Sequence, residues 1–253
     1  MDILTEERQE YILNLLKTTK TIHVQDLIVD LEVSESTIRR DLSDLEDQGL
    51  LIRIHGGAKR AYNLEIDNSL QDKLLLNSEH KTQIAKEAAH LVNDHEYIYL
   101  DAGSTTFAMI PHLKERIGIT VVTNGISHAQ ELSKFKVRTI LLGGFIKGNT
   151  DAIIGPDALS QLKNYHFHKA FIGMNGVDLD YGFTTPDVEG AEVKKQAAKN
   201  SNQCYVVVDR NKFHQVGFAK VMDLDQAIII TNSLEKKLSD SLSKITHFKE
   251  VKE

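Results

Sequence analysis

Cysteine and tryptophan are almost absent from this sequence: its 253 residues include one cysteine, Cys204, and no tryptophan. A lone thiol cannot form a disulfide within the chain, which is typical of a protein kept in a reducing compartment. Cys204 lies in the apolar stretch QCYVVVD, where a packed core thiol is expected rather than a nucleophile.

Long apolar runs are lacking as well. None approaches the ~20 residues that a membrane-spanning helix needs. The N-terminus, MDILTEERQE, lacks the charged-then-apolar layout of a signal peptide. We therefore expect a cytoplasmic protein with no membrane partner, and its length allows one large or two unequal domains.

The chain has no surplus of positive charge. It carries 30 Lys and Arg against 36 Asp and Glu, a net charge of −6, and residues 1–61 alone hold 8 basic against 12 acidic side chains. A protein of this balance can still bind nucleic acid if its basic side chains gather in one local patch.

Such a patch is predicted within residues 33–58, VSESTIRRDLSDLEDQGLLIRIHGGA. Ser34 is suited to cap a helix. Ile38, Leu42 and Leu45 recur at spacings of four and three, so one face of that helix is apolar. Gly49 is placed to end it.

The surrounding segments complete a recognisable unit. Helices are predicted from Thr5 to about Thr18 and from His23 to Leu31. After the third helix we expect a short strand over Leu50–Ile54, a turn at Gly56-Gly57 and a basic tip at Lys59-Arg60. Two helices, a third helix and a hairpin form a winged helix-turn-helix, in which the third helix enters the major groove of DNA.

The polar face of this unit predicts which side chains contact DNA. They are Ser34, Ser36, Thr37, Arg39, Arg40, Arg53, His55, Lys59 and Arg60. Arg39 has Glu35 four positions before it as a competing partner. A three-helix module that binds protein instead of DNA is the alternative, but the acids of the third helix lie beyond its basic first turns.

From Ser78 onward apolar, β-branched stretches alternate with amphipathic ones, which indicates a parallel sheet buried on both faces. Strands are predicted at residues 97–101, 119–123, 137–142, 169–173, 204–209 and 227–231, and helices at 78–92, 105–113, 125–132 and 187–200. We predict three parts: a DNA-binding domain over 1–58, a linker over 59–77 and an α/β domain over 78–253.

Polar, glycine-bearing turns follow four of the predicted strands. They are Asp101–Thr106, Thr123–Gly125, Gly143-Gly144 and Asn175-Gly176. Tight turns between strands and helices need glycine anyway. However, the carboxyl ends of parallel strands lie at one edge of a sheet and bind ligands there. The N–H groups and hydroxyls at Gly103, Ser104 and Thr105 would suit a phosphate at a helix start.

The order of residues in TIRRDLSDLEDQGLLIRIHGGA resembles the N-terminal signature of DeoR-type bacterial transcriptional regulators. DAGSTT, VVTNG, LLGG, KAFIGMNGVD, GFTTPDVEGAEVKK and VVVDRNKF resemble their sensor domain, and the similarity extends to about Asn232. The resemblance implies a C-terminal domain similar in fold to sugar-phosphate isomerases such as ribose-5-phosphate isomerase.

The resemblance also implies a site. Gly103, Ser104 and Thr105 would hold a phosphate, and the same crevice would be lined by Asp101, Thr123, Asn124, Glu189, Lys194, Asp209 and Lys212. Members of the family commonly carry Asp where this chain has His168, which puts an acidic role there in doubt. His166 and His168 lack a third ligand at a suitable spacing, so no metal is expected.

These observations predict an N-terminal winged helix-turn-helix, mainly α, and a C-terminal α/β domain with a mostly parallel sheet. We expect a nucleoid-associated repressor of a sugar-utilisation operon, without catalytic residues or cofactor, that is released from double-stranded operator DNA by a phosphorylated sugar. Fructose 1-phosphate is the expected effector, and a homodimer or homotetramer the expected assembly. The alternatives are an isomerase-like enzyme with an accessory DNA-binding domain, and a DNA-binding scaffold without a ligand.

Overall fold

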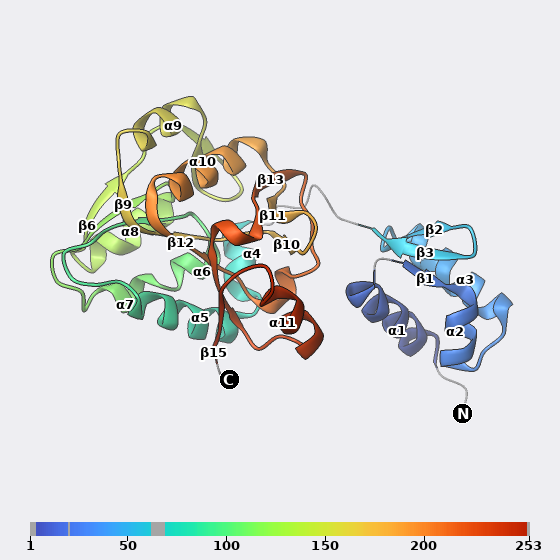
Figure 1. Ribbon diagram of the computed structural model, residues 1–253. Helices are drawn as coiled ribbons and strands as arrows, with labels where there is room; N and C mark the ends of the chain where they lie inside the picture. Colours follow the sequence, from blue (N-terminus) through green and yellow to red (C-terminus); the bar gives the residue numbers. More distant parts are fainter. Residues whose placement is uncertain (1–3, 20, 62–68, 252–253) are drawn as a thin grey trace. The chain divides into compact units, whose positions relative to one another are not determined.

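The computed structural model describes residues 4–19, 21–61 and 69–251. The chain divides into two compact units, residues 1–63 and residues 64–253, each with its own core (Figure 1). None of the helices in the described ranges is long and apolar enough to cross a bilayer.

The N-terminal unit is the predicted winged helix-turn-helix. Its elements are α1 (Thr5–Thr18), β1 (Thr21–His23), α2 (Val24–Leu31), α3 (Glu35–Asp47), β2 (Leu51–Ile54) and β3 (Gly57–Arg60). The predicted apolar face of α3 is buried, because Ile38, Leu42 and Leu45 pack with residues of α1 and α2 in one cluster. The strand β1 was not predicted. The helix α1 begins at Thr5 as predicted, and its N-cap is Leu4.

The ends of α3 follow the sequence signals closely. The Ser34 hydroxyl accepts a hydrogen bond from the Thr37 N–H at 3.2 Å, as an N-cap does. At the other end Gly49 has a positive φ of 70°. Its N–H donates to the Glu46 carbonyl, and the Leu50 N–H donates to the Leu45 carbonyl. This pair of bonds is a Schellman motif, which satisfies carbonyls that the helix leaves open.

The wing differs from the prediction in its register. The turn is formed by His55 and Gly56, and Gly56 has the positive φ, 76°. Gly57 instead belongs to β3, the middle strand in the order β1-β3-β2. A Cβ on Gly57 would lie 2.0 Å from the Ile22 carbonyl oxygen. The close approach of β1, which the sequence did not reveal, therefore explains the second glycine.

The position of Lys59 and Arg60 changes accordingly. They lie in β3 and not at the tip of the wing, so the predicted basic tip is wrong. The wing also continues past residue 58, where the predicted boundary of the domain lies. Of the predicted linker, residues 62–68 lie outside the described residues, and the last part forms the helix α4 (Leu70–Leu75).

The C-terminal unit is built on a seven-stranded sheet in the order β15-β14-β12-β9-β4-β5-β6, with every pair parallel. The strands are β4 (Tyr97–Leu100), β5 (Thr120–Thr123), β6 (Arg138–Leu141), β9 (Phe167–Ile172), β12 (Ser201–Val207), β14 (Ile228–Asn232) and β15 (Phe248–Val251). All six predicted strands are present, and β15 was not predicted.

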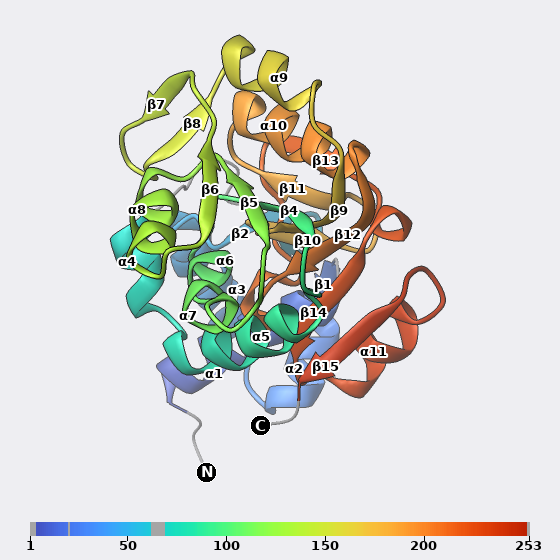
Figure 2. The ribbon, with the colours of Figure 1, turned by 90° about the vertical axis from the view of Figure 1, so that its left-hand side faces the viewer.

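Helices cover both faces of this sheet (Figures 1 and 2). One face packs against α5 (Ser78–His90), α7 (Ile110–Leu113) and α8 (Ile126–Lys134), and the other against α9 (Pro156–Leu162), α10 (Val188–Lys199) and α11 (Lys236–Leu242). The predicted helix over 105–113 is in fact two four-residue helices, α6 (Ser104–Phe107) and α7.

Five short strands form two additional small sheets in this unit, and none of them was predicted. The hairpin β7 (Phe145–Lys147) and β8 (Ala152–Ile154) is one addition. An antiparallel sheet of β10 (Gly176–Asp178), β11 (Gly182–Thr185) and β13 (Ala219–Met222) is another. Each of these strands has only three or four residues, too few to show a reliable alternation in the sequence.

The strand order reverses direction next to β4. The chain runs from β4 to β5 and β6 on one side, and then returns to place β9 on the other side of β4. Loops leave such a pair of strands in opposite directions, which opens a crevice at their carboxyl ends. The residues that follow β4 and β9 are therefore the ones that the topology places at a ligand site.

Candidate functional site

The exposed start of α3 carries a cluster of hydroxyls and arginines. The Ser34 hydroxyl lies 2.8 Å from that of Ser36 and 2.9 Å from that of Thr37. Arg39 is bonded to Glu35 through Nε at 2.8 Å and Nη2 at 2.6 Å, as its spacing suggested. Arg40 is exposed, and no ion pair links it to another described residue. Its guanidinium is therefore available for phosphates or base edges.

The wing contributes less free charge than predicted. Arg53 donates from its backbone N–H to Glu46 at 2.8 Å, and its guanidinium lies 3.8 Å from the same carboxylate. Arg60 donates to the carbonyl oxygen of Leu16 through Nε at 2.8 Å, so it ties β3 to α1. His55, at the turn, and Lys59 remain exposed.

A buried ion pair fixes α3 against α1. Arg8 donates from Nε and Nη2 to the two oxygens of Asp41, at 2.7 and 3.0 Å, and both residues are buried. A bidentate pair of this kind sets orientation as well as distance. The charge of Asp41 is thus balanced inside the unit. Its partner could not be inferred from the sequence, because the two residues lie 33 positions apart.

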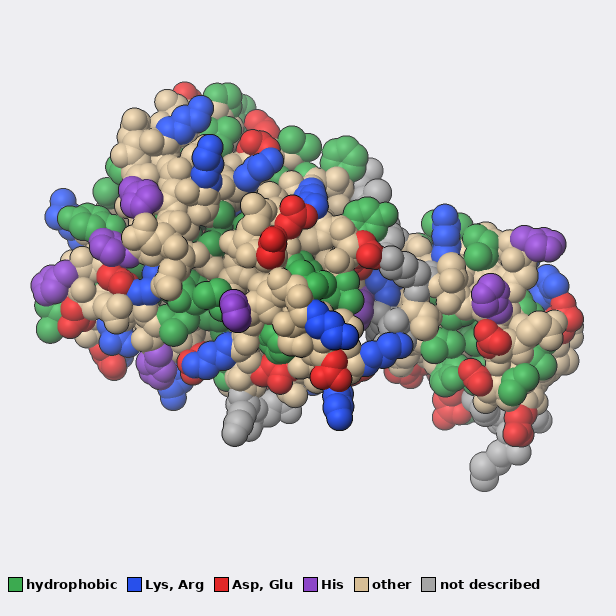
Figure 3. All heavy atoms as spheres, viewed as in Figure 1, with side chains coloured by type: hydrophobic (Ala, Val, Ile, Leu, Met, Phe, Trp, Pro, Cys, Tyr) green, Lys and Arg blue, Asp and Glu red, His purple; other side chains and the backbone are tan. Residues whose placement is uncertain are grey.

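Charges of both signs are intermingled on the face shown in Figure 3. This agrees with the net charge of −6. Because the chain has no surplus of positive charge, DNA binding would depend on the few basic and polar residues at the start of α3 and on the wing.

The C-terminal unit has a pocket at the predicted edge of the sheet, where β4, β9 and β12 end. Eight of the thirteen residues predicted to hold the effector line it. They are Asp101, Gly103, Ser104, Thr105, Asn124, Asn175, Lys194 and Lys212. The pocket lies at the point where the strand order reverses, which is why residues far apart in the sequence meet there.

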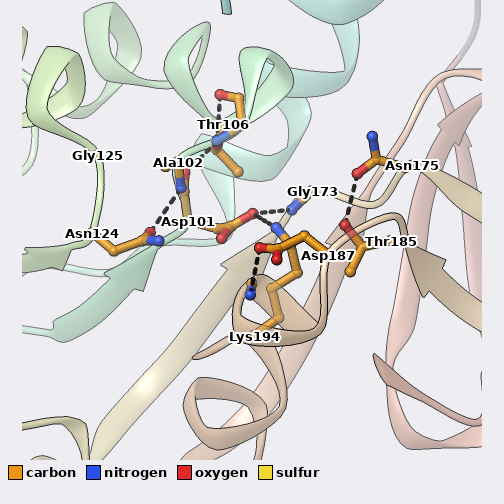
Figure 4. A network of polar contacts seen from close by, with 12 residues as sticks. Asp101, Ala102, Thr106, Asn124, Gly125, Gly173, Asn175, Thr185, Asp187 and Lys194 are labelled. Carbon is orange, nitrogen blue, oxygen red and sulfur yellow. Dashed lines mark hydrogen bonds and ion pairs between the residues drawn. The ribbon is translucent and has the colours of Figure 1, made fainter. Parts of the chain in front are cut away.

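Asp101 is the centre of the polar network in this pocket (Figure 4). Its carboxylate, which is buried, accepts a hydrogen bond from Lys194 of α10 at 2.5 Å and from the Gly173 N–H at 3.1 Å. The first residue after β4 is thereby joined to the first residue after β9 and to a helix of the opposite layer. Both bonds are made to the same oxygen, Oδ2, so they fix the orientation of the carboxylate and leave Oδ1 as a hydrogen-bond acceptor.

The loop after β4 presents donors to the pocket. Ser104 and Thr105 are buried, and within the described chain no protein acceptor is found for their backbone N–H groups or their hydroxyls. The first N–H groups of a helix have no partner inside it. Because α6 has only four residues, a helix dipole contributes little, and the attraction for an anion comes from these local donors.

Side chains behind the loop hold it in place. Asn124 accepts hydrogen bonds from the Tyr99 hydroxyl at 2.9 Å and the Ala102 N–H at 3.0 Å. Thr106 donates to the Asp101 carbonyl at 2.6 Å. Asn124, which was predicted to bind the effector, thus lines the pocket and also shapes the loop.

His128 of α8 supports the same loop from the core. Its Nε2 lies 3.0 Å from the Gly103 carbonyl oxygen and 3.2 Å from the Thr106 hydroxyl. Because a carbonyl only accepts, Nε2 carries the proton. Burial lowers the pKa of His128 to about 4, although Asp101 and the bond to Gly103 oppose that effect. The imidazole is therefore neutral at pH 7.

The rim of the pocket contains residues that the sequence analysis missed. They are Leu70, Lys73, Lys147, Thr150, Thr185 and Asp187, with several backbone segments. The Lys147 Nζ lies 3.5 Å from the Asp187 Oδ2. The Thr185 hydroxyl donates a hydrogen bond to the Asn175 Oδ1 at 3.0 Å. Leu70 and Lys73 lie on α4, Lys147 on β7 and Thr185 on β11, while Thr150 lies in the turn between β7 and β8 and Asp187 is the N-cap of α10. Segments as short as these show no pattern that marks them as part of a ligand site.

Five predicted effector residues do not line the pocket. Thr123 is fully buried and accepts from the Gly125 N–H. Gly143 is bonded to Gln161, and Gly144 lies beside it on the exposed loop before β7. Glu189 is exposed at the start of α10. Asp209 is buried just behind the lining residue Val208.

Asp209 belongs to a charged cluster next to the pocket. One of its oxygens accepts from the Asn211 N–H, and the other has no hydrogen-bond partner. Lys81 of α5 is buried nearby and donates to the Lys73 carbonyl oxygen. The pKa of Lys81 is lowered to about 8, mainly by burial and also by Lys212 and Lys73, while Asp209 opposes the change.

The unusual His168 lies away from this chemistry. It is exposed near the start of β9, where its Nδ1 accepts from the Tyr97 N–H at 3.1 Å and its ring stacks on Tyr97. The pocket lies beyond the other end of that strand. His166 is hydrogen-bonded to Asn202. Among the described residues no group of three metal-binding side chains occurs.

The charges and the hydrogen-bonding groups of the wall indicate which class of ligand this pocket can bind. Four lysines and two aspartates line it, so the wall carries a net charge of +2. Free N–H and hydroxyl donors lie at one point of the wall, and amide and carboxylate acceptors at others. This combination suits a small, hydroxylated dianion.

Comparison with known proteins agrees with both units. Residues 8–63 match the family described as the DeoR-like helix-turn-helix domain, and residues 76–233 match the DeoR C terminal sensor domain. A ribose 5-phosphate isomerase from Methanocaldococcus jannaschii superposes on 54% of this chain and 55% of its own, with a TM-score of 0.40 and 21% identity. A similarity of that extent says nothing about activity.

Several relatives of similar length are named as transcriptional regulators or repressors. The uncharacterized HTH-type transcriptional regulator FruR of Bacillus subtilis is 39% identical over 99% of this chain and 100% of its own length. The HTH-type transcriptional repressor GlcR of the same organism is 33% identical, over 90% and 89%. A putative aga operon transcriptional repressor of Escherichia coli O157:H7 is 31% identical, over 89% and 85%. With both domains matched in order and a relative this similar along its whole length, the chain belongs to the DeoR family of transcriptional regulators.

Proposed function

We propose that this protein represses a sugar-utilisation operon and leaves its operator when a phosphorylated sugar binds in the pocket. The observation that carries the proposal is the pocket itself. Its wall has a net charge of +2 and includes the donors of Ser104 and Thr105, and it lies in the same chain as an exposed recognition helix. A ligand can change DNA binding only if it binds two states of the protein with different affinity.

The phosphate is assigned to the loop after β4. Ser104 and Thr105 supply two backbone N–H groups and two hydroxyls that have no other acceptor in the described chain. Lys212 lines the same pocket and adds a positive charge. The sugar hydroxyls are assigned to Asp101, Lys194 and Asn175, since these side chains supply both acceptors and donors.

Fructose 1-phosphate is the first effector to test, because this chain resembles regulators of sugar uptake within the family. Fructose 6-phosphate and glucose 6-phosphate are the comparison compounds. The rival function, isomerisation, requires a free base beside the substrate. The relatives of similar length are named as transcriptional regulators, and we expect no interconversion of aldose and ketose phosphates.

DNA binding is assigned to the start of α3 and to the wing. Arg40 is the principal contact, with Ser34, Ser36, Thr37, Arg39, Arg53, His55 and Lys59 around it. We withdraw Arg60 from this set, because its guanidinium is held by Leu16. Recognition of a symmetric operator requires at least a dimer, and we propose a homodimer or a homotetramer.

The decisive experiment measures operator release by fluorescence anisotropy with increasing fructose 1-phosphate. Ser104→Asp places a carboxylate where the phosphate is assigned, so this variant should bind the operator normally and stay bound at all concentrations of the sugar. Ser104→Ala is the matched control. It removes one hydroxyl but no charge, and should still be released at a higher concentration. Release of Ser104→Asp at the same concentration as the parent would rule out this site.

A further inference from the structure

One wall of the pocket comes from outside the family's sensor domain. Leu70 and Lys73 of α4 line it, whereas the two family matches end at residue 63 and begin at residue 76. In the sequence α4 follows the stretch that joins the DNA-binding unit to the α/β unit. The segment that leads to the DNA-binding unit is therefore also a part of the ligand site.

Specific contacts hold α4 at this position. Leu70 is buried, and its N–H donates to the Asn149 carbonyl oxygen at 3.2 Å, in the turn between β7 and β8. The buried Lys81 donates to the Lys73 carbonyl oxygen near the other end of the helix. In addition α4 packs against α6, which carries Ser104 and Thr105. Thus α4 contacts the same loop to which we assign the phosphate.

The helix has little stability of its own. It has six residues, far fewer than the ~12–15 that an isolated helix needs to be even marginally stable. On its outer side Leu75 is 82% exposed and Leu76 is 54% exposed. Its position therefore depends on the few contacts toward the pocket, and an added contact there has a large effect on how firmly it is held.

Lys73 is placed to make that added contact. It lies in the last turn of α4, lines the pocket, and is close enough to Lys81 to lower the pKa of that amine, as Lys212 does. This corner holds the three ammonium groups and the single carboxylate of Asp209, so it keeps a net positive charge that an anion in the pocket would offset. The anion would thereby draw Lys73, and with it α4, toward the loop after β4.

We propose that Lys73 binds the phosphate of the effector, and that the resulting fixation of α4 transmits pocket occupancy to the segment leading to the DNA-binding unit. The proposal rests on the proposed function and adds the residue and the element that couple the two activities. Coupling of this kind requires that the ligand contact α4 more favourably in one state than in the other.

Hydrogen exchange of the full-length protein with and without saturating fructose 1-phosphate tests the fixation of α4. The amides of residues 70–76 should exchange at least fivefold more slowly with the ligand. Amides of β15, which is remote in the sheet order from β4 and β9, should not change. This measurement needs no variant, so it remains decisive even if a substitution in α4 prevents folding.

Calorimetric titration tests the contact. Lys73→Met should bind fructose 1-phosphate at least tenfold more weakly and need correspondingly more of it for operator release. Gln71→Ala is the control, because Gln71 lies in the same helix, is exposed and does not line the pocket. Its affinity should be that of the parent.

The outcomes separate the two proposals. Suppose that the parent binds fructose 1-phosphate and Ser104→Asp does not: the proposed function then stands. If, in the same experiments, Lys73→Met binds as tightly as the parent and the amides of residues 70–76 exchange at the same rate with and without the sugar, the role of α4 is refuted. If the parent binds none of the three sugar phosphates, the proposed function fails, and the role of α4 fails with it.

Discussion

Lys194 donates a hydrogen bond to the buried carboxylate of Asp101 at 2.5 Å, although the two residues are 93 positions apart. The bond joins the loop after β4 to α10, on the far layer of the sheet. Because Asp101 also accepts from the Gly173 N–H, it links the two strands between which the strand order reverses. The pocket is thus built around an ion pair that the fold, and not sequence proximity, creates.

Removal of one member of this pair should be costly. Lys194→Met leaves the buried carboxylate of Asp101 without its counter-charge, and we expect the free energy of unfolding of the α/β unit to fall by about 3 kcal/mol. The double variant Asp101→Asn with Lys194→Met should lose less than the single Lys194→Met. Urea denaturation followed by circular dichroism measures both. A double variant less stable than Lys194→Met would contradict this account.

The recognition helix is tested through Arg40. Arg40→Ala should weaken operator binding by about 1–3 kcal/mol, the usual cost of a lost base or phosphate contact. Arg138→Ala, which removes an exposed arginine from β6, is the control and should bind as the parent does. Anisotropy titrations with labelled operator give the affinities. Equal affinity of Arg40→Ala and the parent would show that the residue does not contact DNA.

The two glycines of the wing should respond differently to the same change. A Cβ at Gly57 would collide with the Ile22 carbonyl at 2.0 Å, whereas a Cβ at Gly56 meets nothing within 4 Å and only has to adopt a positive φ. Gly56→Ala should cost about 1–2 kcal/mol, and Gly57→Ala clearly more, because β1 must move away from β3.

Thermal unfolding and operator affinity check this order. Both variants should lower the unfolding transition of the DNA-binding unit, Gly57→Ala by more, while the transition of the α/β unit stays where it is. If Gly57→Ala were as stable as Gly56→Ala, the close approach of β1 would be in error.

His128 should make the α/β unit sensitive to acid. Its pKa is lowered by burial to about 4, while an exposed histidine in the unfolded chain titrates near ~6.5. Between these values the unfolded state binds more protons, so stability falls as the pH drops below ~6.5, by at most about 1.4 kcal/mol per pH unit. Above ~6.5 this contribution is fully present.

The comparison of the parent with His128→Gln isolates that effect. The variant retains a hydrogen-bond donor but cannot titrate, so its stability should change less between pH 7 and pH 4.5. Urea midpoints at several pH values provide the test. Identical pH profiles of the two proteins would mean that other groups cause the acid sensitivity.

Local patterns in the sequence determined the main helices of both units and most strands of the large sheet. Ser34 and Gly49 marked the ends of α3 because a helix end needs a specific acceptor and a residue that tolerates positive φ. The apolar, β-branched runs marked six of the seven strands of the large sheet, because a parallel sheet with helices on both faces is apolar on both sides. The polar turns after those strands placed Gly103, Ser104 and Thr105 at the pocket in advance.

The tertiary structure decided which residues from distant segments meet, and local sequence patterns do not specify this. Whether a polar residue lines the pocket depends on the order of the strands in the sheet. That order brings Asp101 together with Gly173 and Lys194. It also buries Thr123 and leaves Gly143 outside the pocket. Likewise Gly57 and Arg60 serve β1 and α1 and not the tip of the wing. Such pairings form between segments distant along the chain, and the period of side chains along one segment carries no information about them.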